Sequence, residues 1–530
     1  MTEPTPQDRC AEAGSLQDIL ASKRAKVAEL RGRGIDPYPP RATRTHMCGA
    51  AAALAQKLEP GTSGTETVAC AARVTGWRDQ GKVIFGDLQD QTGRIQVYIK
   101  SGVLPAADFE LAKRDVHAGD FLAVAGTLMR TKRGEPSIAA SSVAMLAKAL
   151  RPMPEKWHGL KDVELRYRHR HLDLIASEGV RRKFEQRSLI VSTIRRTMEA
   201  RGFMEVETPV LLAQAGGASA RPFVTHHNAL NADLVMRIAT ELYLKRLVIG
   251  GFDKVYEIGR IFRNEGIDTR HNPEFTMMEA YQAYSDYNGM AELFEALVAE
   301  CAEALKVSEV VYGEHKLSLK PPFRRLYLPE LWKDRCGAPL SEVLKGKGFN
   351  RPRLLALAEK LGVPAGEKTP GAKVFERVFD AKIMPLLDQL TFVFDHPTAI
   401  TPLAKLKAGS EGLVERFECF AAGQEYANAY TELNDPADQR ERLAEQARQR
   451  QEEGDEEADV LDEDFVEAME CGMPPMGGIG VGIDRLVMLL TGQPSIRDVI
   501  LFPTLKKEEA PPPPRVEKSH APGTTPPGAS

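Results

Sequence analysis

The segment Gly259–Tyr281, GRIFRNEGIDTRHNPEFTMMEAY, constrains the fold most strongly, because it predicts two antiparallel strands joined by a charged loop. Side chains two residues apart on a strand share a face, so Arg263 and Glu265 point the same way. The side chains that share one face of the second strand are Phe275, Met277, Glu279 and Tyr281. The hairpin therefore presents an arginine, two carboxylates and two aromatic rings to one side.

Two interpretations of this face are open. A charged hairpin is often a solvated, salt-bridged surface, but aromatic rings beside the charges favour a polyanion that also has a flat ring. Arg263 suits a phosphate held by two parallel hydrogen bonds, and Phe275 suits stacking on a base. Glu265 suits an exocyclic amine, so the set as a whole matches ATP. The loop between the strands adds Arg270, His271 and Asn272.

A second cluster lies in Phe417–Leu433, FECFAAGQEYANAYTEL. Several of its side chains share one strand face by the two-residue period, and Glu418 and Glu425 lie just upstream of them. Paired carboxylates beside a triphosphate suit Mg²⁺, a hard ion that prefers oxygen ligands. The residues that share the face are Asn428, Tyr430 and Glu432.

Two further segments complete the pattern. A glycine-rich string, Gly477–Gly482, precedes Asp484, Arg485 and an apolar helix, and its glycines allow the backbone to approach a nucleotide closely. Upstream, an amphipathic helix is predicted over Arg182–Ala200, followed by a glycine, a short strand and Pro209.

Together these segments resemble the three motifs of the class II aminoacyl-tRNA synthetases. The F-R-x-E sequence at Arg263, its loop and Phe275 resemble motif 2. The helix-strand unit that ends at Pro209 resembles motif 1, and the glycine string with Arg485 resembles motif 3. Motif 3 usually has glutamate before its arginine, whereas Asp484 is typical of the lysine, aspartate and asparagine subgroup.

The resemblance runs from about Ser15 to about Pro503 and is closest to the lysyl-tRNA synthetases of the bacterial type. It implies a homodimer, with motif 1 at its interface, that activates L-lysine with ATP and Mg²⁺ and transfers the lysyl group to tRNA(Lys). The implied catalytic residues are Arg263, His271 and Arg485. The implied ATP-binding residues are Arg263, Glu265, His271, Asn272, Phe275 and Arg485, and the implied metal ligands are Glu418 and Glu425. The implied lysine-binding residues are Gly217, Glu241, Glu279, Tyr281, Asn428, Tyr430 and Glu432, and those for the anticodon are Arg73, Phe85 and Gln96.

The charges implied for the amino-acid pocket favour lysine. Glu241, Glu279 and Glu432 are expected there with no basic side chain except the ATP-facing Arg263, so the pocket repels the side-chain carboxylate of aspartate. Two other readings are a relative that lysylates a protein and a non-catalytic RNA-binding regulator. The first typically lacks an N-terminal barrel, and the second typically loses the motif arginines.

The fold class is predicted to be α+β. Short strands and turns from Glu66 to Leu150 suggest a small barrel, which the resemblance identifies as a five-stranded OB-fold that binds the anticodon. Phe85 is either a base-stacking residue of this barrel or part of its core. The resemblance implies a class II catalytic domain, an antiparallel sheet flanked by helices. The predicted parts are a disordered tail at 1–14, a helical extension at 15–65, the OB-fold domain at 66–150, a linker at 151–175, the catalytic domain at 176–505 and a disordered Pro-rich tail at 506–530.

Two basic segments each have two readings. The predicted helix that starts near Ser15 carries a basic face, which is either solvated or in contact with phosphate. The run Arg166–His171 either contacts tRNA phosphates or packs between domains.

Composition adds few restrictions. The formal net charge of -4 means that any RNA-binding surface is local. The seven cysteines are scattered without a C-x-x-C pair, which argues against a zinc ribbon or a disulfide framework and for a reducing compartment. The N-terminus has neither a secretory nor a transit pattern, and no stretch is apolar enough to span a membrane. A cytoplasmic protein with no membrane partner is expected.

Overall fold

The computed structural model describes residues 16–153, 162–177, 179–218, 220–453 and 462–506. The chain divides into two units, residues 1–160 and 161–530. The predicted tail at 1–14 and, apart from Lys506, the predicted tail at 506–530 lie outside the described residues. Within the described ranges, no helix is long and apolar enough to cross a membrane, and the six cysteines are all free.

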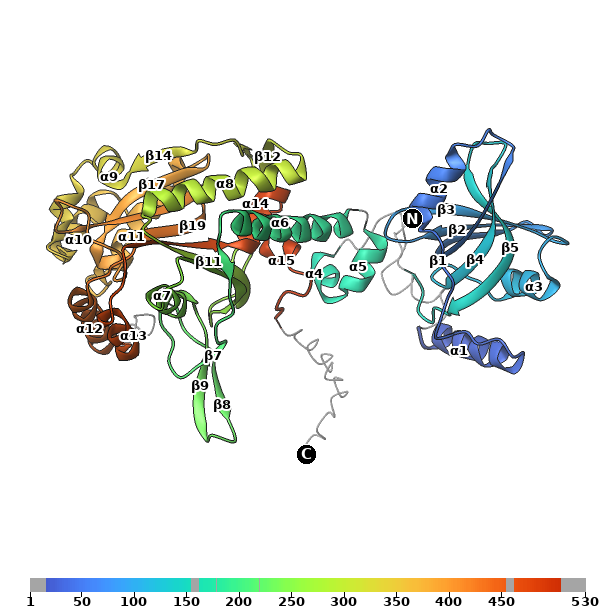
Figure 1. Cartoon of the computed structure of the whole chain (residues 1–530), viewed down its shortest axis with the longest axis horizontal. Coiled ribbons are helices and arrows are strands. Elements are labelled where there is room, and N and C mark those ends of the chain that lie inside the picture. Colours follow the sequence, from blue (N-terminus) through green and yellow to red (C-terminus); the bar gives the residue numbers. More distant parts are fainter. Residues whose placement is uncertain (1–15, 154–161, 178, 219, 454–461, 507–530) are drawn as a thin grey trace, which may run out of the picture. The chain divides into compact units, whose positions relative to one another are not determined.

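The N-terminal unit is a closed five-stranded barrel with the strand order β1-β2-β3-β5-β4, which confirms the predicted barrel (Figure 1). Alternate side chains point inward, so Ile95, Val97 and Ile99 of β3 all lie in its core. The strands are β1 (Ser63–Asp79), β2 (Val83–Gln89), β3 (Arg94–Lys100), β4 (Phe121–Arg130) and β5 (Pro136–Ala147). The helices of this unit are α1 (Leu16–Gly32), α2 (Cys48–Gln56) and α3 (Ala106–Arg114).

The basic helix α1 packs within this unit through the buried side chains of Val27 and Leu30. Lys26 and Arg33 form ion pairs with the buried carboxylate of Asp115, at 2.8 and 2.6 Å. Part of the basic face is therefore occupied by an internal partner. Phosphate contact stays a prediction for the rest of that face.

The C-terminal unit is built on an eight-stranded sheet with the order β14-β17-β18-β19-β20-β11-β10-β6. Neighbouring strands are antiparallel except at the two edges, where β14 is parallel to β17 and β6 is parallel to β10. This confirms the predicted antiparallel sheet. The strands of the sheet are β6 (Met204–Glu205), β10 (Lys254–Phe262), β11 (Glu274–Ala283), β14 (Arg324–Tyr327), β17 (Thr391–Pro397), β18 (Leu413–Ala421), β19 (Gln424–Thr431) and β20 (Met476–Gly482).

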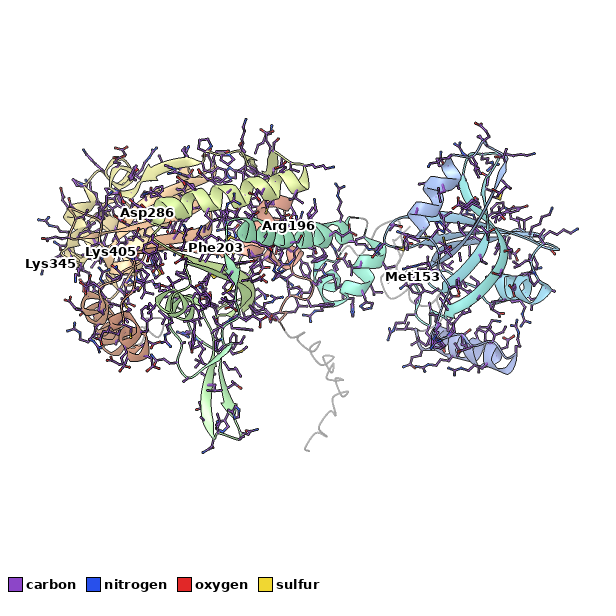
Figure 2. The ribbon with its side chains drawn as sticks, viewed as in Figure 1. Met153, Arg196, Phe203, Asp286, Lys345 and Lys405 are labelled. Carbon is purple, nitrogen blue, oxygen red and sulfur yellow. The ribbon has the colours of Figure 1, made fainter. Side chains whose placement is uncertain are left out.

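The sheet shares one hydrophobic core with helices that include α6 (Val180–Ala200), α8 (Tyr287–Leu305) and α14 (Ile483–Thr491) (Figure 1). The core joins Ile194 of α6 and Phe294 of α8 to Phe417 of β18. Phe203, which follows α6, is buried in the same core, and the carboxylate of Asp286 caps α8 by accepting from the backbone N–H of Asn288 at 2.9 Å (Figure 2). These contacts fix the sheet whose other face holds the site.

Shorter elements complete the unit. Its other helices are α4 (Val163–Arg168), α5 (Arg170–Ala176), α7 (Glu241–Ile249), α9 (Leu328–Cys336), α10 (Arg351–Lys360), α11 (Gly371–Lys382), α12 (Pro436–Glu453), α13 (Glu463–Glu470) and α15 (Ile496–Val499). Three short 3₁₀ helices are η2 (Leu340–Val343), η3 (Met384–Leu386) and η4 (Thr398–Ile400). The small sheets contain β7 (Leu211–Leu212), β8 (Val224–His227), β9 (Ala232–Met236), β12 (Glu309–Tyr312), β13 (His315–Ser318), β15 (Leu344–Lys345) and β16 (Gly348–Phe349).

The basic run at 166–171 is engaged inside the C-terminal unit. Arg170 is buried and donates to the carboxylate of Asp173 at 2.7 Å and to the carbonyl of Leu501 at 2.9 Å. Arg166 donates to the same carboxylate at 2.9 Å, and Arg168 donates to the carbonyl of Lys506 at 2.6 Å. These contacts favour packing over tRNA binding for the three arginines.

Candidate active site

A cavity of about 740 Å³ opens on the free face of the large sheet. It gathers side chains from the β10–β11 hairpin, from β18, β19 and β20, and from the starts of α7 and α14. The predicted ATP, lysine and metal residues that line it are Gly217, Glu241, Arg263, Glu265, His271, Asn272, Phe275, Glu279, Tyr281, Glu418, Glu425, Asn428, Tyr430 and Arg485. Glu432 is the one predicted residue of these three groups that is not part of the lining.

The predicted hairpin is present, but its first strand ends earlier than expected. β10 stops at Phe262, whereas the sequence pattern placed Arg263 and Glu265 on the strand. The backbone N–H of Arg263 still donates to the carbonyl of Pro273, just before β11, at 2.9 Å. The backbone N–H of Asn264 instead donates to the carbonyl of Arg221 at 2.8 Å. The chain is therefore drawn away from β11 after Arg263, because a third segment competes for its hydrogen bonds.

Arg263 and Arg485 face the same cavity. The guanidinium of Arg263 lies 5.3 Å from the ring centre of Phe275, and its buried Nε donates no hydrogen bond to any described residue. Arg485 donates to the backbone carbonyl of Glu425 at 3.1 Å. Burial lowers the pKa of Arg263, while the carboxylates of Glu265 and Glu425 act in the opposite direction.

The position of Arg485 is fixed through its neighbour, Asp484. The Asp484 carboxylate is buried, accepts from the backbone N–H of Thr276 at 2.6 Å and pairs with Arg187 of α6. Asp484 thus ties α14 to the strand that carries Phe275. This gives a structural role to the aspartate that distinguishes this sequence from the usual form of motif 3.

Two loop residues predicted to bind ATP have partners inside the protein. The Nδ1 atom of His271 lies 2.9 Å from the Asp268 carboxylate, and the His271 side chain is exposed. Asn272 is buried, with its amide donating to the carbonyl of Glu274 at 2.6 Å and accepting from Thr504 at 3.2 Å. Asn272 therefore also anchors the segment after α15.

A β-bulge brings Glu418 and Glu425 together. Along β18 and β19 the register shifts between Cys419 and Phe420, so β19 carries one extra residue there. Tyr426 and Ala427 are consecutive yet both lie in the core behind the sheet, which leaves Glu425 on the cavity side. Burial raises the pKa of Glu425, and the charge of Glu418 raises it further.

Arg416 is a residue of this region that the sequence analysis missed. It lies two residues before Glu418 on β18 and lines the cavity. Its guanidinium donates to the side-chain oxygen of Asn428 at 3.0 Å and pairs with the Glu418 carboxylate. The two-residue period that placed Asn428 on the site face would have placed Arg416 there from Glu418.

The opposite end of the cavity is deeply buried. Glu279 accepts from the backbone N–H of Thr240 at 3.2 Å and from the hydroxyl of Tyr281 at 3.3 Å. Burial, followed by the charge of Glu241, raises the pKa of Glu279 to about 7. The hydroxyl of Tyr430 lies 2.8 and 2.7 Å from the two oxygens of Glu241 and donates to this carboxylate.

The glycines of β20 leave room for these side chains. β20 pairs with β11 and β19, so that Gly478 lies between Tyr281 and Tyr430, and Gly480 lies between Glu279 and Asn428. A Cβ on Gly478 would lie 2.0 Å from an oxygen of Glu432, and one on Gly480 would lie 2.6 Å from the side chain of Met277. The glycines of β20 therefore leave space for the side chains of Glu432 and Met277. The sequence analysis had assigned these glycines only to the close approach of a nucleotide.

The expectation that the amino-acid pocket holds no basic side chain except Arg263 was wrong. Lys245 on α7 is fully buried, and its ammonium forms ion pairs with Glu241 and Glu432. The error arose because α7 turns Lys245, one turn beyond Glu241, toward the same side. Arg416, which lines the same cavity and contacts Asn428 and Glu418, is a second basic side chain that the count omitted.

On the barrel, Phe85 and Gln96 lie on the outer face of β2 and β3. Phe85 pairs with Tyr98 and its ring lies 5.5 Å from that of Tyr98, while Gln96 accepts from the hydroxyl of Ser137 at 3.1 Å. Phe85 is half-buried and is not among the buried residues of the barrel core, so the reading of Phe85 as core is not supported. Arg73 is half-buried, 4.2 Å from the ring of Phe121, and donates to Gly119 at 2.9 Å.

Family models match both units. Residues 162–506 match the model of the tRNA synthetases class II (D, K and N), and residues 68–146 match the OB-fold nucleic acid binding domain. The first match contains the whole cavity, and the second contains the barrel strands that carry Arg73, Phe85 and Gln96.

Curated relatives match over nearly their full length. Lysine–tRNA ligases of Dehalococcoides mccartyi and Moorella thermoacetica are 47% and 49% identical, each over 93% of this chain and 98% of the relative. The lysine–tRNA ligase of Halalkalibacterium halodurans is 46% identical over 94% of this chain and 99% of its own length. The chain belongs to the class II tRNA synthetases of the D, K and N group and, within them, to the lysine–tRNA ligase family.

Proposed function

We propose that this chain activates L-lysine with ATP to lysyl-adenylate and transfers the lysyl group to the 3′ end of tRNA(Lys). The observation that carries the proposal is a single cavity with arginines at one part and buried carboxylates at another. Buried polar atoms without hydrogen-bond partners, on a positive and on a negative side chain, support it. The Nε of Arg263 is a buried donor without a partner, and the oxygens of Glu432 receive no hydrogen bond from the described residues apart from the Lys245 ion pair.

The buried carboxylates suit the two ammonium groups of lysine. Glu241 takes the α-amino group, and Glu279 and Glu432 take the ε-ammonium, while Tyr281 and Tyr430 flank the apolar stem. Even with Lys245 counted, this end keeps an excess of carboxylates, so a substrate with a carboxylate side chain is disfavoured. Gly217 has φ +84° and closes the wall beside Glu241, and Asn428 completes the lining.

The chemistry needs no general base, because the carboxylate of lysine is already ionised at neutral pH. It attacks the α-phosphorus of ATP in line, and pyrophosphate leaves. Arg263 neutralises the charge that develops on the α-phosphoryl group, while Arg485 and His271 hold the outer phosphates. In the second step the terminal ribose hydroxyl of tRNA attacks the lysyl carbonyl, and AMP leaves.

Glu418 and Glu425 fit Mg²⁺. They are close enough that the charge of Glu418 raises the pKa of Glu425, which is the situation that a shared cation relieves. The described residues contain no group of three or more histidine, cysteine or acidic side chains that could hold a metal, so Glu418 and Glu425 would hold the ion together with ligands from outside the protein, such as phosphate oxygens and water. When bound, the ion supplies further neutralisation of phosphate charge.

We place the anticodon on the outer face of the barrel, at Arg73, Phe85 and Gln96. A half-buried ring beside an amide suits stacking on one base and hydrogen bonding to its edge. This barrel counts against a relative that lysylates proteins, and the presence of Arg263 and Arg485 counts against a non-catalytic regulator.

We further propose a cytoplasmic homodimer with its interface at α6 and the strands after it. Exposed apolar side chains in this region support an interface: Leu189 on α6, Met204 on β6 and Leu211 on β7 are 36, 42 and 48% exposed. Sedimentation of the purified protein measures this directly, and a monomer at micromolar concentration contradicts it.

Exchange of labelled pyrophosphate into ATP tests the activation step. Exchange is expected with lysine and not with aspartate or norleucine, since norleucine has the same apolar stem without the ε-ammonium. Charging of tRNA(Lys) transcripts, with an anticodon-altered transcript as control, then tests the transfer. Exchange driven by aspartate, or by norleucine as well as lysine, would overturn the assignment of the pocket.

A further inference from the structure

Lys245 is a buried charged residue that the sequence analysis did not predict. It lies on α7, its side chain is fully buried, and its Nζ contacts the carboxylates of Glu241 and Glu432, which belong to two different elements. An ammonium group removed from water is strongly destabilising unless it is paired and its geometry is good. This one is paired twice.

Aromatic rings enclose the same ammonium. Its Nζ lies 5.5 Å from the ring centre of Tyr430, and 5.9 Å from those of Tyr281 and Phe465. Tyr281 and Tyr430 belong to the proposed lysine pocket, while Phe465 comes from α13 behind it. The ammonium of Lys245 therefore lies next to two tyrosines that line the cavity, although Lys245 itself is not part of the lining.

The charged and titratable groups that face this ammonium come from every element around it. Glu241 is on its own helix, Glu279 and Tyr281 are on β11, and Tyr430 and Glu432 are on and just after β19. Burial raises the pKa of Glu432 well above its ordinary value, and Lys245 acts to lower it. Burial alone would lower the pKa of Lys245, but Glu241 and Glu432 together raise it.

The charges balance when lysine is the substrate, so the following inference rests on the proposed function. When all three are ionised, as they must be to bind ammonium groups, three carboxylates and one resident ammonium leave two negative charges for the substrate. Lysine brings two ammonium groups. Without Lys245 the same three carboxylates would exceed the substrate by one charge, and a buried excess charge is removed by taking up a proton.

We propose that Lys245 is the resident counter-ion of the lysine pocket. It pairs with Glu241 and Glu432 and orients them before the substrate arrives, and it sets at two the number of ammonium groups that the pocket accepts. It is a positioning residue, since it acts on lysine through these carboxylates.

Stability as a function of pH tests the counter-ion without any substrate. In Lys245→Met the Glu432 carboxylate loses the ammonium that acts to lower its pKa, so its folded-state pKa rises further, and stability is retained at low pH and lost as pH rises. The melting-temperature deficit against the unaltered protein should therefore widen from pH 5 to pH 8. Val248→Ala, a buried change one turn further along α7, should show a deficit that does not vary with pH.

The double variant Lys245→Met/Glu432→Gln removes both charges of one ion pair. It should melt higher than Lys245→Met at pH 8, and this comparison holds even where the single variant fails to fold. A pH-independent deficit for Lys245→Met, or a double variant no more stable than the single one at pH 8, would overturn the counter-ion.

Kinetics provide a second measurement. In pyrophosphate exchange at pH 7, Lys245→Met should raise the KM for lysine by about tenfold with the KM for ATP unchanged, and the lysine defect should narrow as pH rises and the carboxylates ionise. Equal losses in kcat at every pH would overturn the proposal. If the unaltered protein shows no lysine-dependent exchange, the proposed function fails, whereas the stability comparison still decides the role of Lys245.

Discussion

The two parts of the cavity handle charge in different ways. The part with Arg263, Arg485 and His271 is built from the loop between β10 and β11 and from the first turn of α14, and these three side chains are exposed or half-buried. The part with Glu279 and Glu432 lies inside the sheet, with both carboxylates buried. The first, open part reaches solvent at His271, although the Nε of Arg263 is buried, whereas the second, closed part holds both of its carboxylates away from solvent.

This difference determines how each part prepares for its substrate. At the open part, the Nε of Arg263 stays without a partner and the phosphates of ATP arrive with their own charge. At the closed part, the protein places an ammonium among the carboxylates in advance, because several buried carboxylates without a cation would take up protons. Changes at the open part should therefore affect catalysis, and changes at the closed part should affect lysine affinity and its pH dependence.

The largest effect is expected for Arg263→Ala. Loss of this guanidinium removes charge stabilisation at the α-phosphoryl group, so adenylate formation should fall by at least about 10³-fold. Single-turnover formation of lysyl-adenylate measures it. The melting temperature should stay the same, and Arg260→Ala, an exposed arginine on the same hairpin, should retain activity. Comparable loss in both variants would contradict a specific role.

The second largest effect is expected for Glu432→Gln. It removes one of the two carboxylates assigned to the ε-ammonium and leaves Lys245 with a single partner. The KM for lysine should rise by about 100-fold, while the KM for ATP changes little. Exchange kinetics with each substrate varied in turn provide both values. An unchanged KM for lysine would remove Glu432 from the pocket.

The change in the KM for lysine with pH should be smaller than the change caused by Glu432→Gln. Since the pKa of Glu279 is raised to about 7 in the empty pocket, this carboxyl must lose a proton to bind an ammonium below that pH. The KM for lysine should therefore rise by about tenfold as pH falls from 8 to 6, with little change in the KM for ATP. A KM for lysine that is constant over this range would show that Glu279 is ionised throughout.

The smallest effect is expected for a change in the N-terminal barrel. Phe85→Ala should raise the KM for tRNA(Lys) by about fivefold, because one stacking contact is lost, and should leave lysine-dependent pyrophosphate exchange unaltered. Val103→Ala, an exposed change in the same unit, is the control for tRNA charging. Reduced exchange in Phe85→Ala would mean that the barrel affects the cavity.

The sequence predicted the elements that rest on periodicity. The hairpin at 259–281 and the barrel strands follow from a two-residue alternation and turn signals. The site residues were named by the family resemblance and their roles stay predictions, and those for ATP, lysine and the metal line one cavity except Glu432. The end of β10 at Phe262 was missed, because the competing hydrogen bond of Asn264 comes from Arg221, which is remote in sequence.

Features that depend on tertiary contacts could not be predicted in this way. A bulge beside Tyr426 reverses the faces of β19, and nothing in the local pattern marks the extra residue. Lys245 could have been found from its spacing to Glu241 on one helix, but its contact with Glu432 requires the folded sheet. A count of pocket charges based on motif positions alone therefore missed Lys245.

Proton release on lysine binding tests the central claim most directly. L-Lysine titrated into the protein at pH 7 by calorimetry, in buffers of different ionisation enthalpy, should release protons, because Glu279 with a pKa of about 7 must ionise to receive an ammonium. The release should disappear in Glu279→Gln. Heats of binding that are the same in every buffer would contradict the account.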